Sequence, residues 1–151
     1  MIDITRATTL DADVVAAIDR ACFRDPTVNV ETELRHPWAY LFLARPEGEP
    51  AAQAFLLAWL VSDELHVLSV ATSPDFRRRG LGRALLVHAI EFATSRGAKT
   101  ALLEVRPSNQ AALALYDAFG FVTGRRRPRY YADNQEDAIE MTLALAPRRD
   151  G

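Results

Sequence analysis

Apolar and polar residues alternate along this chain with two different periods, and the changes of period predict where helices and strands lie. In residues 10–23, apolar side chains recur about one helical turn apart, as at Val14 and Ile18, which is typical of an amphipathic helix. Residues 51–61 and 65–72 are nearly continuous apolar runs instead. Such runs favour strands in the centre of a sheet, where both faces are covered.

The rest of the chain carries the same two patterns between short breaks. Gly97 and Gly120 follow two amphipathic stretches at the position where glycine commonly ends a helix. Further strands are predicted at residues 2–6, 40–44, 100–105, 121–131 and 138–145, and further helices at residues 29–36, 80–96 and 111–119. Strands and helices alternate in the second half, so we expect one α/β domain over residues 1–146 and a frayed tail over residues 147–151.

Length and charge narrow the classes of function. A chain of 151 residues suits one domain that can bury a sizeable core. The formal net charge is −2, so the chain lacks a bulk positive field for nucleic acid or anionic membranes. The longest apolar run, residues 51–61, is too short to span a bilayer. We therefore expect no direct nucleic-acid partner and no membrane partner.

Cysteine and histidine are scarce. The single cysteine, Cys22, cannot form a disulfide within the chain and is typical of a reducing compartment. His36, His66 and His88 lie far apart without the spacing of metal ligands. Residues 1–13 are acidic and lack the apolar core of a signal peptide. We expect a cytoplasmic protein that needs no metal.

The most specific pattern follows the strand at residues 65–72. A polar loop over residues 73–79 leads into a helix that begins near Gly80, and Gly80 and Gly82 let a ligand approach the backbone closely. Four arginines surround the two glycines: Arg77, Arg78, Arg79 and Arg83. Because a helix N-terminus carries unpaired N–H groups and partial positive charge, the segment favours a diphosphate-binding site.

Other interpretations of this segment compete. A solvated arginine patch is one, although two glycines are a liability at the start of a helix. A dinucleotide-binding G-x-G-x-x-G turn is another, with Glu104 as the ribose carboxylate. In that case Leu85 occupies the third glycine position, and the loop is longer than the tight turn of that fold. A P-loop is excluded, because no G-K-S/T sequence occurs.

The segment also resembles the Q/R-x-x-G-x-G/A motif of the GNAT acetyltransferase superfamily, through Arg77, Gly80 and Gly82. The likeness extends over about residues 65–145. Within the superfamily the chain most resembles the bacterial ribosomal-protein-alanine N-acetyltransferases. The further matching positions are residues 103–106, 108–109, 114–116, 119–121, 130–131 and 136–138, and Met141.

The resemblance implies a single GNAT domain whose mixed, mostly antiparallel central sheet is flanked by helices. It implies an enzyme that moves an acetyl group from acetyl-CoA to a protein N-terminal α-amine, with alanine of a small-subunit ribosomal protein as the expected acceptor. The alternatives are a GNAT enzyme that acetylates a lysine or a small amine, and a non-catalytic acyl-CoA-binding or RNA-binding domain.

The same resemblance implies which residues hold the coenzyme. They are Val70, Ala71, Thr72, Arg77, Arg78, Arg79, Gly80, Leu81, Gly82, Arg83 and Asn109. Residues 70–72 are expected to pair with the pantetheine arm like a neighbouring strand, and a backbone N–H at or beside Val70 to polarise the thioester carbonyl. Asn109 can also cap the helix that it precedes.

Glu104 and Tyr116 are the candidate catalytic residues. Glu104 interrupts an apolar strand, where a charge needs either a partner or a chemical role. The resemblance makes it a general base that acts through water; the alternative is an edge position or a pairing with an arginine. Tyr116 matches the family tyrosine that donates a proton to the coenzyme A thiolate. Its alternative role is that of an ordinary core aromatic residue.

Three further segments keep two interpretations each. The arginines at 125–127 and 129 could form an RNA-binding patch, but a solvated strand face is favoured. Tyr130 and Tyr131 either flank the peptide cleft or are ordinary strand aromatics. Residues 1–60 match the family only loosely. Phe23 is followed by Arg-Asp-Pro-Thr where family members often carry Phe-Pro-Trp-Ser, in the region that shapes the peptide-binding side.

Overall fold

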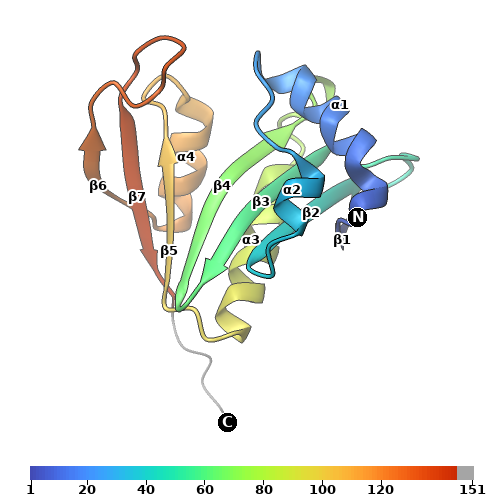
Figure 1. The fold of residues 1–151 in the computed structure, drawn as a ribbon, viewed down its shortest axis with the longest axis horizontal. Helices are drawn as coiled ribbons and strands as arrows, with labels where there is room; N and C mark the ends of the chain where they lie inside the picture. Colours follow the sequence, from blue (N-terminus) through green and yellow to red (C-terminus); the bar gives the residue numbers. More distant parts are fainter. Residues whose placement is uncertain (146–151) are drawn as a thin grey trace.

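The computed structural model describes residues 1–145 (Figure 1). The predicted domain boundary at residue 146 and the predicted tail over residues 147–151 lie outside this part of the chain. The elements are β1 (Ile2–Arg6), the 3₁₀ turn η1 (Thr9–Asp11), α1 (Ala12–Cys22), α2 (Val30–Leu34), β2 (Ala39–Pro46), β3 (Ala54–Val61), β4 (Glu64–Thr72), the 3₁₀ turn η2 (Pro74–Phe76), α3 (Leu81–Ser95), β5 (Thr100–Val105), α4 (Gln110–Phe119), β6 (Val122–Arg127) and β7 (Ala138–Ala144).

The described strands form one seven-stranded sheet in the order β1-β2-β3-β4-β5-β7-β6. All neighbouring strands are antiparallel except β4 and β5, which are parallel. Helices α1 and α2 cover one face of the sheet, and α3 and α4 cover the other (Figure 1). The predicted α/β fold with a mixed, mostly antiparallel sheet flanked by helices is therefore confirmed.

The two faces of the sheet have separate cores. Under α3, the helix predicted from its apolar stripe buries Leu81, Leu85 and Ala89 of that stripe against β2 to β5, and it also buries Leu86, which the stripe did not include. On the opposite face, Val15 and Ile18 of α1 pack against Leu41 of β2 and Phe55 of β3. Both faces of β2 and β3 are thus covered, which explains their nearly continuous apolar sequences.

Several predicted elements differ from the structure in their bounds or in their buried face. Helix α2 ends at Leu34 rather than at residue 36, and β2 extends over Ala39–Pro46 rather than residues 40–44. The buried stripe of α1 runs through Val15, Ile18 and Asp19, so it includes a charged residue that hydrophobic periodicity could not assign to the core. Strand β3 begins at Ala54 rather than at residue 51. Strand β6 ends at Arg127 rather than at residue 131, because Pro128 follows and has no N–H to donate to a ladder.

Strands β4 and β5 pair over a short distance only. The parallel register joins Glu64–Val67 to residues 100–103, and beyond it the two strands diverge (Figure 1). At the same point Val67 faces Ala58 of β3 and Ser69 faces Leu57, so Leu68 is an extra residue in β4. Such a bulge bends its strand. The sheet therefore opens in its centre on the side where β4 ends.

Candidate active site

A cleft of about 500 Å³ lies where β4 and β5 diverge. Its walls come from both strands, from the segment between α1 and α2, from α2 itself, from α4 and from the segment between β6 and β7. The residues that line it include Phe23, Thr27, Glu33, Val70, Glu104, Arg106, Asn109, Tyr116 and Tyr131. The two candidate catalytic residues thus face one cleft, although they lie on different elements.

A second cavity, of about 630 Å³, lies along the end of β4 and the start of α3. All the predicted coenzyme-binding residues except Arg79 line it: Val70, Ala71, Thr72, Arg77, Arg78, Gly80, Leu81, Gly82, Arg83 and Asn109. Arg79 instead lies with its guanidinium 5.0 Å from the centre of the Phe76 ring. Val70, Asn109 and Tyr116 line both cavities, so the two adjoin. A ligand in the second cavity can reach the first.

The loop before α3 has an unusual backbone that aims donors at this second cavity. Arg78 and Gly80 both adopt positive φ, at 64° and 81°. The Arg77 Nε donates a hydrogen bond to the Thr72 carbonyl oxygen over 3.2 Å, which holds the loop against the end of β4. A left-handed residue beside a helix N-terminus turns successive N–H groups toward one point and favours an anion there.

Gly82 lies in the first turn of α3, close to β4 and α4. A methyl group on its Cα would lie 3.9 Å from Leu115 Cδ2 and 4.0 Å from Val70 Cγ1, which are ordinary contacts. The protein alone therefore has room for alanine at this position. The glycine is accordingly best explained by a ligand that approaches the backbone at this turn.

Glu104 lies on the face of β5 that points away from α3 and α4. Its side chain is only 12% exposed, and its Oε1 lies 3.9 Å from Nη1 of Arg127 on β6. The carboxylate thus has the arginine partner that the sequence allowed as an alternative, and it also lines the cleft. An ion pair and a role as proton acceptor are compatible, because an ionised carboxylate is what a general base requires.

Tyr116 is buried in α4, with its ring edge-on to Phe121 at 5.7 Å between centroids. Burial, with a smaller contribution from Tyr131, raises the pKa of Tyr116 to about 12. Its hydroxyl is therefore protonated throughout the neutral range and can serve as a proton donor. Because it lines both cavities, Tyr116 lies at their junction.

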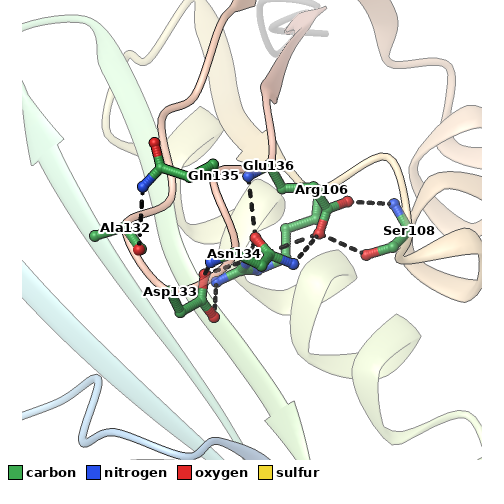
Figure 2. A network of polar contacts seen from close by, with 7 residues as sticks. All are labelled: Arg106, Ser108, Ala132, Asp133, Asn134, Gln135 and Glu136. Carbon is green, nitrogen blue, oxygen red and sulfur yellow. Dashed lines mark hydrogen bonds and ion pairs between the residues drawn. The ribbon is translucent and has the colours of Figure 1, made fainter.

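A polar network ties the segment between β6 and β7 to the segment that follows β5 (Figure 2). Arg106 contacts Asp133 through two hydrogen bonds, and Glu136 accepts hydrogen bonds from the backbone N–H and the hydroxyl of Ser108. The Arg106 guanidinium also lies 3.8 Å above the ring of Tyr131. The network fixes one wall of the cleft next to Glu104. The sequence does not predict that Arg106 and Asp133 pair with each other, because the two residues lie 27 positions apart.

The opposite end of the cleft depends on a buried carboxylate that sequence analysis also missed. Asp19 is 2% exposed and accepts hydrogen bonds from the Thr27 N–H (2.8 Å), the Thr27 hydroxyl (2.6 Å) and the Val28 N–H (3.0 Å). These bonds hold the segment that follows Phe23 against α1, and Phe23 and Thr27 of this region line the cleft. The apolar pattern of the helix carries no signal for Asp19, because that pattern assigns a charged residue to the surface.

Residues 1–145 contain neither a cluster suited to a metal ion nor a helix suited to a membrane. No group of three or more histidine, cysteine, aspartate or glutamate side chains is arranged to hold a metal ion in this part of the chain. None of the described helices has the length and apolar character needed to cross a membrane.

Comparison with known proteins identifies similar chains. The acetyltransferase (GNAT) family matches residues 12–121. The [ribosomal protein bS18]-alanine N-acetyltransferase of Escherichia coli K12 is 40% identical over 122 residues, which cover 73% of this chain and 82% of that protein. The Salmonella typhimurium protein of the same name is 47% identical over 95 residues, covering 62% of this chain and 64% of that one. The crystal structure of the Escherichia coli ribosomal-protein-S18-alanine N-acetyltransferase superposes with a TM-score of 0.86 at 34% identity, over 99% of this chain and 97% of that one.

Proposed function

Because the chain belongs to the GNAT acetyltransferase family, we propose that it acetylates the N-terminal α-amine of a protein, and that the acceptor is the alanine of ribosomal protein bS18 or its counterpart. The family uses acetyl-CoA as co-substrate. The proposed acceptor is a ribosomal protein, so the reaction belongs in the cytoplasm. The observation that carries the proposal is the pair of adjoining cavities, with Glu104 in one and Tyr116 at their junction.

The arginine–glycine loop supports binding of the diphosphate of the co-substrate in the second cavity. Arg77, Arg78 and Arg83 supply positive charge there, and the start of α3 supplies N–H donors. The end of β4, at Val70 to Thr72, supports the pantetheine arm. Beyond the bulge, β4 no longer pairs with β5, so the gap between the two strands can take a partner that pairs with β4 like a strand. Asn109 caps α4 through a 3.2 Å hydrogen bond from the Ala112 N–H, and it lines both cavities.

The chemistry needs two proton transfers, and the two candidate residues suit them. Acetyl-CoA supplies a thioester, from which the acetyl group moves to the neutral amine of the acceptor. Glu104 accepts the proton that the ammonium must lose, through a water molecule, and Tyr116 donates a proton to the departing thiolate sulfur. A backbone N–H at or beside Val70 polarises the acetyl carbonyl. The bond between the acetyl carbon and sulfur breaks, and a bond between the same carbon and the acceptor nitrogen forms. The proton that Glu104 accepts balances the proton that Tyr116 donates.

An α-amine suits this cleft better than a lysine side chain. An α-ammonium group has a pKa of about 7.7–8.0, against about 10.4 for lysine, so its deprotonation near neutral pH costs roughly 3–4 kcal/mol less. A single carboxylate acting through water is adequate for the easier step. The cleft is also walled at both ends, by the Asp19-held segment and by the Arg106 network, which suits a chain end more than a loop.

A peptide comparison tests the proposal. One peptide carries a free N-terminal alanine, and the matched control is the same peptide with its N-terminus blocked and an internal lysine offered. We expect acetyl transfer to the α-amine of the first and much slower labelling of the second, with mass spectrometry locating the acetyl group. Preferential labelling of the lysine, or activity on small amines alone, contradicts the acceptor assignment and leaves the acetyl-CoA chemistry in place.

A further inference from the structure

Two carboxylates lie side by side on neighbouring strands next to the cleft. The register of β5 and β7 sets Glu104 directly opposite Glu140. Their side chains are 12% and 25% exposed, so water screens their repulsion only partly. Like charges directly opposite in an antiparallel pair destabilise the sheet unless a third group compensates them.

Arg127 of β6 compensates both carboxylates at once. Its Nη1 lies 3.9 Å from Glu104 Oε1, and its Nη2 lies 3.7 Å from Glu140 Oε2. Its Nε is buried and has no hydrogen-bond partner among the described residues. The guanidinium also lies 5.7 Å from the centre of the Tyr130 ring. The arginine is thus held by its two carboxylates and by the ring rather than by a hydrogen bond at Nε.

We propose that Arg127 is a positioning residue for Glu104, and that Glu140 weakens its effect by sharing the same guanidinium. The inference rests on the proposed role of Glu104 as the proton acceptor. Arg127 holds the Glu104 carboxylate beside the cleft, whereas Glu140 competes for the same guanidinium, so the two residues together determine how firmly Glu104 is held in place.

Three other titratable side chains near Glu104 carry no charge at neutral pH. His66 lies on β4, and burial lowers its pKa despite the raising effect of Glu104 and of other carboxylates near it. Hydrogen bonding to the Glu104 carboxylate, followed by burial, raises the pKa of Tyr130, and burial raises the pKa of Tyr131. These three side chains therefore stay neutral where the enzyme works, and Arg127 and Glu140 remain the charges in play.

Two more charges belong to the same cleft, and each has a partner of its own. Arg106 is paired with Asp133 at 2.9 Å. Glu33 enters from α2 and accepts a 2.8 Å hydrogen bond from the Trp59 Nε1. Both pairs are unaffected by the substitutions used to test Arg127.

The test uses two substitutions with different expected effects. Arg127→Gln removes the compensating charge and should lower kcat by about three- to tenfold with little change in the KM for the acceptor peptide, because Glu104 is no longer held in its position beside the cleft. Glu140→Gln leaves the guanidinium to Glu104 alone and should leave kcat unchanged or raise it. Arg127→Lys should restore part of the loss. Arg125→Gln is the matched control, since Arg125 lies on the same strand, is exposed and forms no ion pair among residues 1–145.

Two measurements separate this inference from the proposed function. Carboxyl carbon NMR of the protein labelled at glutamate reports the surroundings of the Glu104 carboxylate, with Glu104→Gln identifying its resonance. Steady-state kinetics give kcat and the acceptor KM of each variant. A displaced Glu104 resonance together with a lower kcat in Arg127→Gln supports the positioning role, and if the resonance moves while kcat does not, the assignment of Glu104 as base is what fails. An unmoved Glu104 resonance in Arg127→Gln overturns the inference.

Discussion

Arg106 and Asp133 form a two-point ion pair, with Nη1 2.9 Å from Oδ1 and Nη2 3.0 Å from Oδ2. The pair joins the chain just after β5, two residues beyond Glu104, to the segment between β6 and β7. The pair therefore fixes the position of the proposed base relative to one wall of the cleft. Arg106 does not line the second cavity, which is the one proposed for the coenzyme.

Arg106→Gln should accordingly raise the KM for the acceptor peptide by about three- to tenfold, since the Tyr131 wall loses both the ion pair and the stacked guanidinium. Acetyl-CoA affinity, measured by calorimetry, should stay unchanged. Arg106→Lys keeps the charge but not the planar fork, so we expect an intermediate KM. A fall in acetyl-CoA affinity with an unaltered peptide KM contradicts the assignment of the peptide to the cleft and of the coenzyme to the second cavity.

Gly82→Asp should weaken acetyl-CoA binding on the order of 10²-fold, because it sets a negative charge and extra bulk in the cavity proposed for the diphosphate. Gly82→Asn separates charge from bulk, and Gly82→Ala tests whether the ligand needs the bare backbone. The unliganded protein accommodates that methyl group, so loss of stability is not expected for alanine. Unchanged affinity in the folded Asp variant would show that the diphosphate binds elsewhere.

Glu104→Gln should lower kcat by roughly 10²–10⁴-fold, the usual scale for removal of a general base. The amide has nearly the same shape but cannot accept the proton, so the acidic limb of the pH–rate profile should disappear along with the activity. Stopped-flow detection of free thiol measures both. The assignment fails if the folded variant turns over at the wild-type rate.

Tyr116→Phe should lower kcat over the same range while acetyl-CoA affinity is largely kept, since only the proton donor is lost. The ring packs edge-on against Phe121, and phenylalanine preserves that contact. Titration with coenzyme A, followed by calorimetry, checks the affinity in parallel with turnover. A variant that binds coenzyme poorly but keeps its kcat would assign Tyr116 to binding instead.

The raised pKa of Tyr116 also predicts how stability depends on pH. Folded Tyr116 loses its proton near pH 12, whereas the unfolded residue does so near pH 10. The folded state therefore holds more protons between these values, and the free energy of unfolding falls as pH rises from 10 to 12. At pH 11 the loss from this group is about 1 kcal/mol. Urea midpoints of the wild type and Tyr116→Phe between pH 8 and 11 should diverge accordingly, and parallel curves would refute the effect.

Sequence alone could predict the elements that local patterns define. The glycines at 80, 97 and 120 all adopt positive φ, so the helix limits that they set were predicted correctly. The pairing of Glu104 with Glu140 could not be foreseen, because β7 inserts between β5 and β6 and the register depends on tertiary packing. Asp19 was missed for a different reason: hydrophobic periodicity assigns a charged residue to the surface, whereas hydrogen bonds from Thr27 and Val28 make its burial favourable.

The position of β6 at the rim of the sheet gives its arginine run a consequence for solubility. One edge of β6 pairs with β7, and its other edge has no strand beside it within the described chain. Unpaired strand edges are templates on which further copies of a protein can add and aggregate. Arg125 is exposed on this edge strand, whereas Arg126 is paired with Asp137 over 2.7 Å. Charged side chains on an edge strand oppose the approach of a second copy edge to edge. The position of the arginine run at the edge of the sheet thus accounts for its charge without a nucleic-acid partner.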